Sequence, residues 1–329
     1  MTTVYSFLCG FLAALFLTVL FMRLLLPILR RRHVGQRILE IGPSWHSVKE
    51  GTPTMGGLSF LGGILLSVMI AYILLIKVTS TLFLRPLIFA FLYALLNAFV
   101  GLIDDLTKFR KKQNEGLTPS QKIVLQIAFA AAYLALLRIY GYIDTAFYIP
   151  YFNTVVDFGL SYYFFALILC VGTVNCVNLT DGIDGLCSTV TLIVGAFFAL
   201  AAATLSNEST LVLSAAIMGG CLAFLFFNRH PAKVFMGDTG SLFLGGTVVG
   251  CAFTLDSPLL LLIVGLPYLF EGVSVILQVG YYKLTKKRLF RMAPFHHHLE
   301  KCGWSEGRIV TAFALGTVLL GFLAFFGVK

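Results

Sequence analysis

The chain has 329 residues, of which 58% are hydrophobic and 12% are charged, whereas an ordinary soluble domain is about 25% charged. This composition excludes a soluble globular protein and predicts an all-α integral membrane protein, folded as a single polytopic domain over residues 1–329. The seven cysteines are scattered and form no Cys-x-x-Cys pair, which favours buried thiols over a metal or redox site.

Ten apolar runs are long enough to cross a membrane, since a span needs about 20 residues and fewer where neighbouring helices shield its ends. The ninth run contains Pro267 and Glu271, so we expect that helix to be kinked or broken. The predicted spans are Val4–Leu26, Leu58–Ile76, Leu87–Ile103, Ile123–Ile139, Tyr162–Val177, Leu186–Leu205, Leu211–Phe227, Leu242–Leu255, Leu259–Tyr282 and Ile309–Val328.

The net charge of +9 has two candidate explanations, nucleic-acid binding and membrane topology. In a ten-span arrangement only Lys77, Arg85, Arg138 and Lys329 lie on one side, and every other Lys and Arg lies on the opposite side. The positive-inside rule places the side with most of the Lys and Arg residues in the cytoplasm, and both termini outside. Topology therefore explains the charge, and no nucleic-acid partner is predicted.

The longest outside loop, residues 141–159, is rich in aromatic and β-branched residues. Pro150 and Asn153 lie near its middle. This pattern favours a short β-hairpin at the membrane interface.

A polar, glycine-bearing stretch, VNCVNLTDGIDGLC at 174–187, interrupts the apolar sequence on the cytoplasmic side. Asp181 and Asp184 are three residues apart, so a helix would place both carboxylates on one face. Carboxylates at a bilayer edge need a partner, so we expect them to hold a ligand, with a metal as the first candidate. The alternative is a cap for the following helix, which leaves Asp184, Asn175 and Asn178 unexplained.

Two adjacent carboxylates, Asp104 and Asp105, follow the third span, with Lys108, Lys111 and Lys112 close behind. Near a divalent cation both carboxylates can stay ionised. The alternative is an interfacial acidic pair, solvated and matched by the lysines.

The sequence Gly-Asp-Thr-Gly-Ser at 237–241 opens the eighth span. Free backbone N–H groups and the positive end of a helix suit a phosphate, which Asp238 would repel unless a divalent cation lay between them. Mg²⁺ prefers one or two carboxylates together with phosphate oxygens. A helix cap with a turn is again the alternative.

Three consecutive histidines occur in APFHHHLE at 293–300. Successive residues of a helix point in different directions, so they are not expected to ligate one ion, and we expect hydrogen bonds to a phosphate or sugar instead. With KEGTPTMGGL at 49–58, these segments converge on one membrane face. Their conjunction predicts Mg²⁺-dependent phosphoryl chemistry on a substrate whose anionic head reaches the cytoplasmic surface.

These residues make the sequence similar to the polyprenyl-phosphate N-acetylhexosamine-1-phosphate transferases, and within them to the bacterial phospho-N-acetylmuramoyl-pentapeptide transferases. The motifs that carry the resemblance are TPTMGG at 52–57, DD at 104–105, NxxNLTDGIDGL at 175–186, NxxPAxVFMGDTGS at 228–241 and PFHHHLE at 294–300.

The resemblance implies a reaction in the bacterial inner membrane, with the active site on the cytoplasmic face of a homodimer. UDP-MurNAc-pentapeptide and undecaprenyl phosphate would give lipid I and UMP, with Mg²⁺ as cofactor. It implies Asp238 as the Mg²⁺ ligand, with Asp105 and Asp181 as further candidates. Asp104 is the position proposed to deprotonate the lipid phosphate or to attack directly, and Phe235 resembles a residue that stacks on uracil.

The resemblance also implies two sets of site residues. The catalytic set is Asp104, Asp105, Asp238 and His297. The substrate-binding set is Lys49, Thr54, Lys112, Asn175, Asn178, Leu179, Asp181, Asp184, Asn228, Phe235, Gln278, Ala293, His296, His297 and His298.

Two other functions are compatible with parts of the pattern. A sister enzyme would use UDP-GlcNAc or another UDP-sugar with the same polyprenyl phosphate. An ion-coupled transporter would use the acids as a relay, and it predicts carboxylates near the middle of the bilayer rather than at one set of helix ends.

Overall fold

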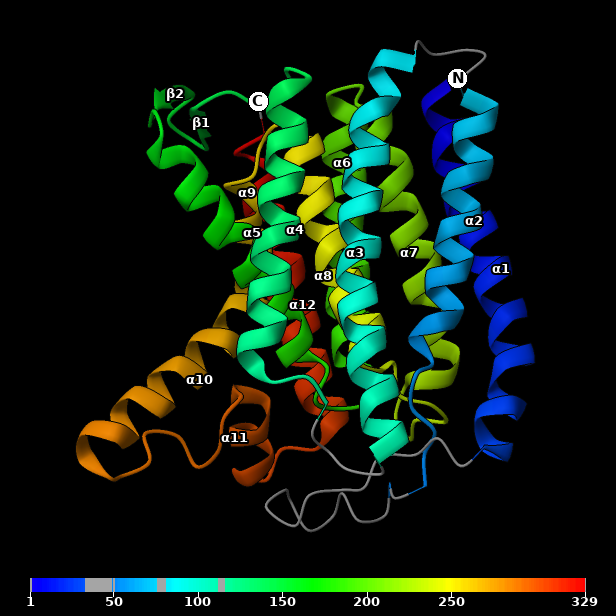
Figure 1. Cartoon of the computed structure of the whole chain (residues 1–329), viewed down its shortest axis with the longest axis vertical. Helices are drawn as coiled ribbons and strands as arrows, with labels where there is room; N and C mark the ends of the chain where they lie inside the picture. Colours follow the sequence, from blue (N-terminus) through cyan, green and yellow to red (C-terminus); the bar gives the residue numbers. More distant parts are fainter. Residues whose placement is uncertain (1, 33–48, 50, 76–80, 112–115, 329) are drawn as a thin grey trace.

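The computed structural model describes residues 2–32, 49, 51–75, 81–111 and 116–328. Within these residues the chain is almost entirely helical, with one small hairpin (Figure 1). The elements are α1 (Thr2–Arg31), α2 (Gly57–Leu75), α3 (Thr81–Lys111), α4 (Pro119–Ile139), β1 (Ala146–Ile149), β2 (Thr154–Asp157), α5 (Ser161–Thr180), α6 (Leu186–Thr204), α7 (Glu208–Asn228), α8 (Gly237–Thr254), α9 (Leu260–Val264), α10 (Leu266–Thr285), α11 (Phe295–Lys301) and α12 (Glu306–Phe325).

Eight of these helices, α1 to α7 and α12, are long and apolar enough to cross a membrane. The all-α membrane class predicted from composition is therefore confirmed. The two other predicted spans correspond to α8 and to the α9–α10 pair. Nearly all residues of α8 are buried.

α8 packs most closely against α3, and glycines make this approach possible. A Cβ added to Gly246 would lie 2.7 Å from Cα of Ala94 on α3, and one added to Gly245 would lie 2.7 Å from Cα of Val174 on α5. Small residues let backbones meet in membrane bundles. The middle of α8 is thereby held between α3 and α5.

The ninth apolar run is interrupted at Gly265, which separates α9 from α10 two residues before Pro267. Figure 1 shows α10 leaving the bundle obliquely, with α11 folded back beside it. Glu271 is fully buried although it lies on this projecting helix. The partner that explains this burial is a histidine of α11.

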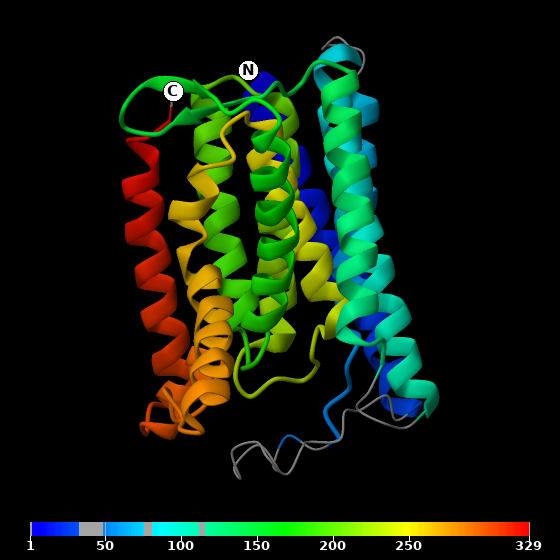
Figure 2. The ribbon, with the colours of Figure 1, turned by 60° about the vertical axis from the view of Figure 1, so that its left-hand side comes forward.

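The hairpin predicted in the loop 141–159 is present. β1 and β2 pair antiparallel, with Phe147 opposite Val156. Tyr151, in the turn, donates a hydrogen bond from its hydroxyl to the carbonyl of Leu323 on α12, at 2.9 Å. Both termini lie at the same end of the bundle as the hairpin, while α10 and α11 lie at the opposite end (Figures 1 and 2).

Candidate active site

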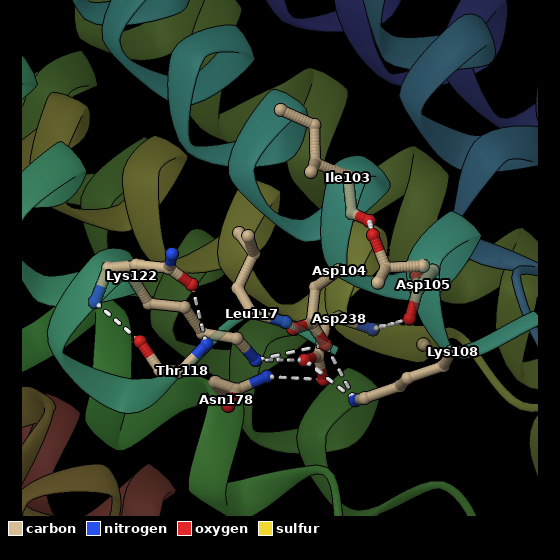
Figure 3. Close-up of polar contacts among 12 residues, drawn as sticks. Ile103, Asp104, Asp105, Lys108, Leu117, Thr118, Lys122, Asn178 and Asp238 are labelled. Atoms are coloured by element: carbon tan, nitrogen blue, oxygen red, sulfur yellow. Dashed lines mark hydrogen bonds and ion pairs between the residues drawn. The ribbon is translucent and has the colours of Figure 1, made fainter. Parts of the chain in front are cut away.

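Two carboxylates from distant helices share the same pair of lysines. Asp104 lies late in α3 and Asp238 is the second residue of α8. The Nζ atom of Lys108 is 2.7 Å from Asp104 Oδ2 and 3.1 Å from Asp238 Oδ2. The Nζ atom of Lys122, from α4, is 3.0 Å and 2.6 Å from the same two oxygens. Figure 3 shows the four side chains converging.

Neutral donors complete the shell around these carboxylates. Asn178 donates from Nδ2 to Asp238 Oδ1 at 3.2 Å and to the Ser241 hydroxyl at 2.7 Å. The backbone N–H of Leu117 donates to Asp104 Oδ1 at 2.7 Å. A buried carboxylate is tolerated when it is paired and hydrogen-bonded, and both of these are. The sequence-based expectation that Asp104 and Asp238 lie together is met.

Asp105 lies beside this pair and binds the start of α8. It accepts hydrogen bonds from the N–H of Asp238 at 3.1 Å, the N–H of Thr239 at 2.9 Å and the hydroxyl of Thr239 at 2.6 Å. The residue at the N-cap is Met236, so Asp238 is not the cap of its own helix. In this structure two of the N–H groups expected to receive a phosphate, those of Asp238 and Thr239, are bound to Asp105.

Asp181 and Asp184 do not share a helix face, so that expectation is wrong. α5 ends at Thr180 and α6 begins at Leu186, because Gly185 adopts a left-handed conformation (φ 77°) that ends the turn between them. Removal from water raises the pKa of the Asp181 carboxyl, and the negative charges of Asp238, Asp105 and Asp184 raise it further. The Asp181 carboxyl therefore lies within electrostatic range of Asp105 and Asp238 on one side and of Asp184 on the other.

Asp184 instead forms a second ionic cluster. Its Oδ1 lies 2.7 Å from Nζ of Lys49, and its Oδ2 accepts from the N–H of Ala232 at 2.9 Å. Nδ1 of His230 is 3.1 Å from the same Oδ2. Glu306, which the sequence did not single out, is 2.7 Å from the Lys49 ammonium through Oε1.

Three amide residues predicted to bind substrate make structural hydrogen bonds here. Asn175 donates to Gln126 Oε1 at 2.7 Å and so joins α5 to α4. Asn228 accepts from the N–H of Gly185 at 3.1 Å. Gln278 accepts from the N–H of Phe290 at 2.8 Å, which closes the connection between α10 and α11. Asn175 and Asn228 thus join segments that carry the two clusters, whereas Gln278 holds the segment before α11.

The three histidines of α11 have three different partners, as their consecutive positions on a helix require. Nδ1 of His296 lies 3.1 Å from Oε2 of the buried Glu271. Nδ1 of His297 is 2.6 Å from Oε2 of Glu300. Nδ1 of His298 accepts from the N–H of Arg291 at 3.1 Å. Two of the partners, Glu271 and Glu300, are acids that the sequence did not assign to the site.

The position of Phe235 is fixed by two backbone hydrogen bonds to the segment 53–56. Its N–H donates to the carbonyl of Pro53 and its own carbonyl accepts from Gly56, each at 2.8 Å. The ring is half-buried. The neighbouring Thr54 hydroxyl is buried and makes no hydrogen bond within the described part of the chain. The segment that carries the predicted TPTMGG motif thus lies against the start of α8.

Of the remaining predicted site residues, two are described by the structure and one is not. Leu179 is half-buried in the last turn of α5 beside Asn178, and Ala293 is half-buried just before α11. Lys112 lies outside the described residues. Lys122 occupies the site and was missed, although it lies near the cytoplasmic start of the predicted fourth span. Its basic charge was assigned to topology, which hid its role.

Two groups of side chains have the geometry to hold a cation. Asp104, Asp105 and Asp238 each offer an oxygen within 4.8 Å of the others, and Asp184, His230 and Glu306 do the same with mixed ligands. Only oxygen ligands occur in the first group, which is the preference of Mg²⁺. The first group fits that ion better, because the second includes a histidine nitrogen beside its two carboxylates.

Comparison with known proteins decides the family. Residues 87–256 match the model of glycosyl transferase family 4. Three similar curated proteins are each named phospho-N-acetylmuramoyl-pentapeptide-transferase. They come from Clostridium perfringens (43% identical, 92% of both chains), Clostridioides difficile strain 630 (40%, 98% of this chain and 97% of the relative) and Caldicellulosiruptor bescii (42%, 98% and 96%).

The chain belongs to the phospho-N-acetylmuramoyl-pentapeptide transferase family. The resemblance read from the motifs is confirmed. The glycosyl transferase family 4 match covers α3 to α8, the elements that carry Asp104, Asp105, Lys122, Asn178 and Asp238. The relatives extend the phospho-N-acetylmuramoyl-pentapeptide transferase likeness over the histidine tract and α12 as well.

Proposed function

We propose that this protein transfers phospho-MurNAc-pentapeptide from UDP-MurNAc-pentapeptide to undecaprenyl phosphate, giving lipid I and UMP. The observation that carries the proposal is the pairing of Asp104 and Asp238 through Lys108 and Lys122 at one end of the bundle (Figure 3). Two carboxylates and two ammonium groups at one point suit a reaction between two anionic phosphates.

The carboxylate of Asp238 would hold Mg²⁺, with Asp105 and Asp181 as further candidate ligands. When bound there, Mg²⁺ would neutralise pyrophosphate charge and make UMP a better leaving group. Asp105 contributes by position, since its three hydrogen bonds fix the turn that carries Asp238. The ammonium groups of Lys108 and Lys122 would orient phosphate oxygens.

We favour a single displacement. An oxygen of the lipid phosphate attacks the β-phosphorus of the donor, and the bond from that phosphorus to the oxygen of UMP breaks. A phosphate monoester is already nucleophilic at neutral pH, so it needs positioning more than activation. Asp104 then acts as a base or an orienting group. Isolation of a phospho-sugar aspartyl enzyme after incubation with donor alone would overturn the single step.

The setting completes the proposal. We propose that the protein is a multi-pass protein of the bacterial inner membrane, a single domain acting as a homodimer, with the active site at the cytoplasmic face and both termini outside. The basic loops and the separation of the carboxylate cluster from the termini support this orientation. The same separation argues against a transporter, whose relay acids would lie near the middle of the bilayer.

Purified protein with Mg²⁺ and undecaprenyl phosphate tests the function. UMP release is measured with UDP-MurNAc-pentapeptide and, separately, with UDP-GlcNAc. We expect release from the first donor alone; release only from UDP-GlcNAc would make the chain a sister enzyme. Asp238→Asn should abolish release, whereas Asp256→Asn, an exposed residue after the far end of α8, should leave it intact.

A further inference from the structure

Glu306 is the first residue of α12 and lies far in the sequence from Lys49 and Asp184, the residues it contacts. Its carboxylate is nearly buried, with the side chain 8% exposed, and it contacts Nζ of Lys49 through Oε1 at 2.7 Å and through Oε2 at 2.8 Å. Oε2 also accepts the backbone N–H of Asp184 at 3.0 Å. One carboxylate therefore fixes a predicted substrate-binding lysine and the loop between α5 and α6.

The second ionic cluster joins four segments of the chain. Lys49 lies between the carboxylates of Asp184 and Glu306, and Asp184 reaches on to His230 and to the N–H of Ala232. His230 Nδ1 is 3.6 Å from Glu306 Oε2, so both carboxylates face the same histidine. Breaking a buried ionic network by removing one partner costs more than an exposed pair would suggest.

The charge balance of the cluster distinguishes it from the first one. Two lysines face two carboxylates at Asp104 and Asp238, whereas one lysine faces two carboxylates at Asp184 and Glu306. The single Lys49 charge is therefore more than compensated by the two carboxylates. The second cluster is therefore organised to place hydrogen-bond donors at defined positions rather than to supply net positive charge to a phosphate.

We infer that Glu306 is a positioning residue that holds Lys49 and the 181–185 loop in the geometry that binds the nucleotide end of the donor. The inference rests on the proposed function, since it takes the donor to be UDP-MurNAc-pentapeptide. Glu306 acts through Lys49 and Asp184 and touches neither reacting phosphate. Its loss should therefore weaken donor binding and leave the chemical step and the lipid acceptor nearly unaffected.

Glu306→Gln keeps the shape and an acceptor for the Asp184 N–H but removes the negative charge that holds Lys49. We expect the KM for UDP-MurNAc-pentapeptide to rise about tenfold, with kcat and the KM for undecaprenyl phosphate unchanged. The matched control is Arg308→Gln, an exposed residue of the same helical turn that stacks on Trp304, which should leave all three constants unchanged. A merely structural role would lower kcat or raise both KM values together, and that outcome overturns the inference.

A double-mutant cycle tests whether Glu306 acts through Lys49. In a Lys49→Met background, Glu306→Gln should add little to the donor KM; an additive increase contradicts the inference. If Glu306→Gln does not fold, Glu306→Asp replaces it: a donor-specific rise in KM supports the inference, and an unchanged donor KM overturns it. Failure of the proposed function is separate, because the wild-type protein would then release no UMP.

Discussion

Asp105 binds the first turn of α8 through Thr239, accepting both its N–H at 2.9 Å and its hydroxyl at 2.6 Å. Thr239→Val keeps the side-chain shape and removes the hydroxyl donor. A hydrogen bond to a charged group contributes about 1.5–3 kcal/mol, so we expect a loss of about 2 kcal/mol in unfolding free energy. Turnover should fall with it, since Asp238 lies on the same turn.

Thr247→Val on the same helix is the control, because the Thr247 hydroxyl bonds only to the carbonyl of Leu244 among the contacts described. Equilibrium unfolding in detergent and UMP release measure both variants. If Thr239→Val matched Thr247→Val in stability and in turnover, Asp105 would not be the residue that fixes Asp238.

Lys122 contacts the carboxylates of Asp104 and Asp238 at 3.0 Å and 2.6 Å. Lys122→Met leaves Lys108 alone with two carboxylates. We expect turnover at saturating Mg²⁺ to fall by at least about tenfold, because a substrate phosphate loses the ammonium group that faces it. The Mg²⁺ concentration that gives half-maximal activity should not rise. Lys122→Arg should retain part of the activity. A Lys122→Met enzyme with normal turnover would remove this lysine from phosphate binding.

The sequence predicted where polar residues gather more reliably than what each one touches. Hydropathy placed the end of the third span at Ile103, yet α3 runs to Lys111. Asp104 and Lys108 lie one helical turn apart and pair within it, so the helix continues where the apolar run stops. The length of an apolar run indicates which residues contact lipid. The length of the helix also depends on side-chain pairs such as Asp104 and Lys108.

Long-range partners were beyond the sequence. Nothing near Lys49 indicates that Glu306 lies beside it, because the two are brought together only by the packing of α12 against the bundle. The same holds for Glu271 and His296, which meet because α11 folds back beside α10. The spacing of Asp181 and Asp184 was interpreted as helical because the left-handed turn at Gly185 was not anticipated.

Phe235 presents a half-buried ring on a backbone held by Pro53 and Gly56. Stacking of a base on an aromatic ring contributes about 1–3 kcal/mol. We therefore expect Phe235→Ala to raise the donor KM by about tenfold or more with a smaller change in kcat. Phe226→Ala, which removes an exposed ring from α7, should change neither. A fall in kcat alone would argue against stacking.

Asp157 ends β2 and accepts hydrogen bonds from the Thr145 hydroxyl at 2.7 Å and the N–H of Gly159 at 2.8 Å. These bonds hold the pKa of Asp157 below its usual value. A carboxyl with a lowered pKa stabilises the folded hairpin above its unfolded pKa of about 3.9, and the effect is lost as pH falls through the folded pKa. Asp157→Ala should therefore speed amide exchange in residues 154–159 at pH 7, and the difference from wild type should shrink below about pH 4. A difference that persists in acid would exclude ionisation as its cause.

Gly182, between Asp181 and Ile183, packs against the imidazole of His296, and a Cβ added there would overlap Nε2 of that ring. The ring cannot easily retreat, since Glu271 lies against its other nitrogen and both side chains are fully buried. We expect Gly182→Ala to separate α11 from the loop that carries Asp181, with a loss of about 1–3 kcal/mol in stability from overpacking. UMP release should fall in parallel.

Gly307→Ala, which places its methyl group in open space on α12, is the control and should be neutral or slightly stabilising. Adding His296→Ala to Gly182→Ala removes the overlap and should recover part of the lost stability; no recovery would show that the two side chains do not compete for this space.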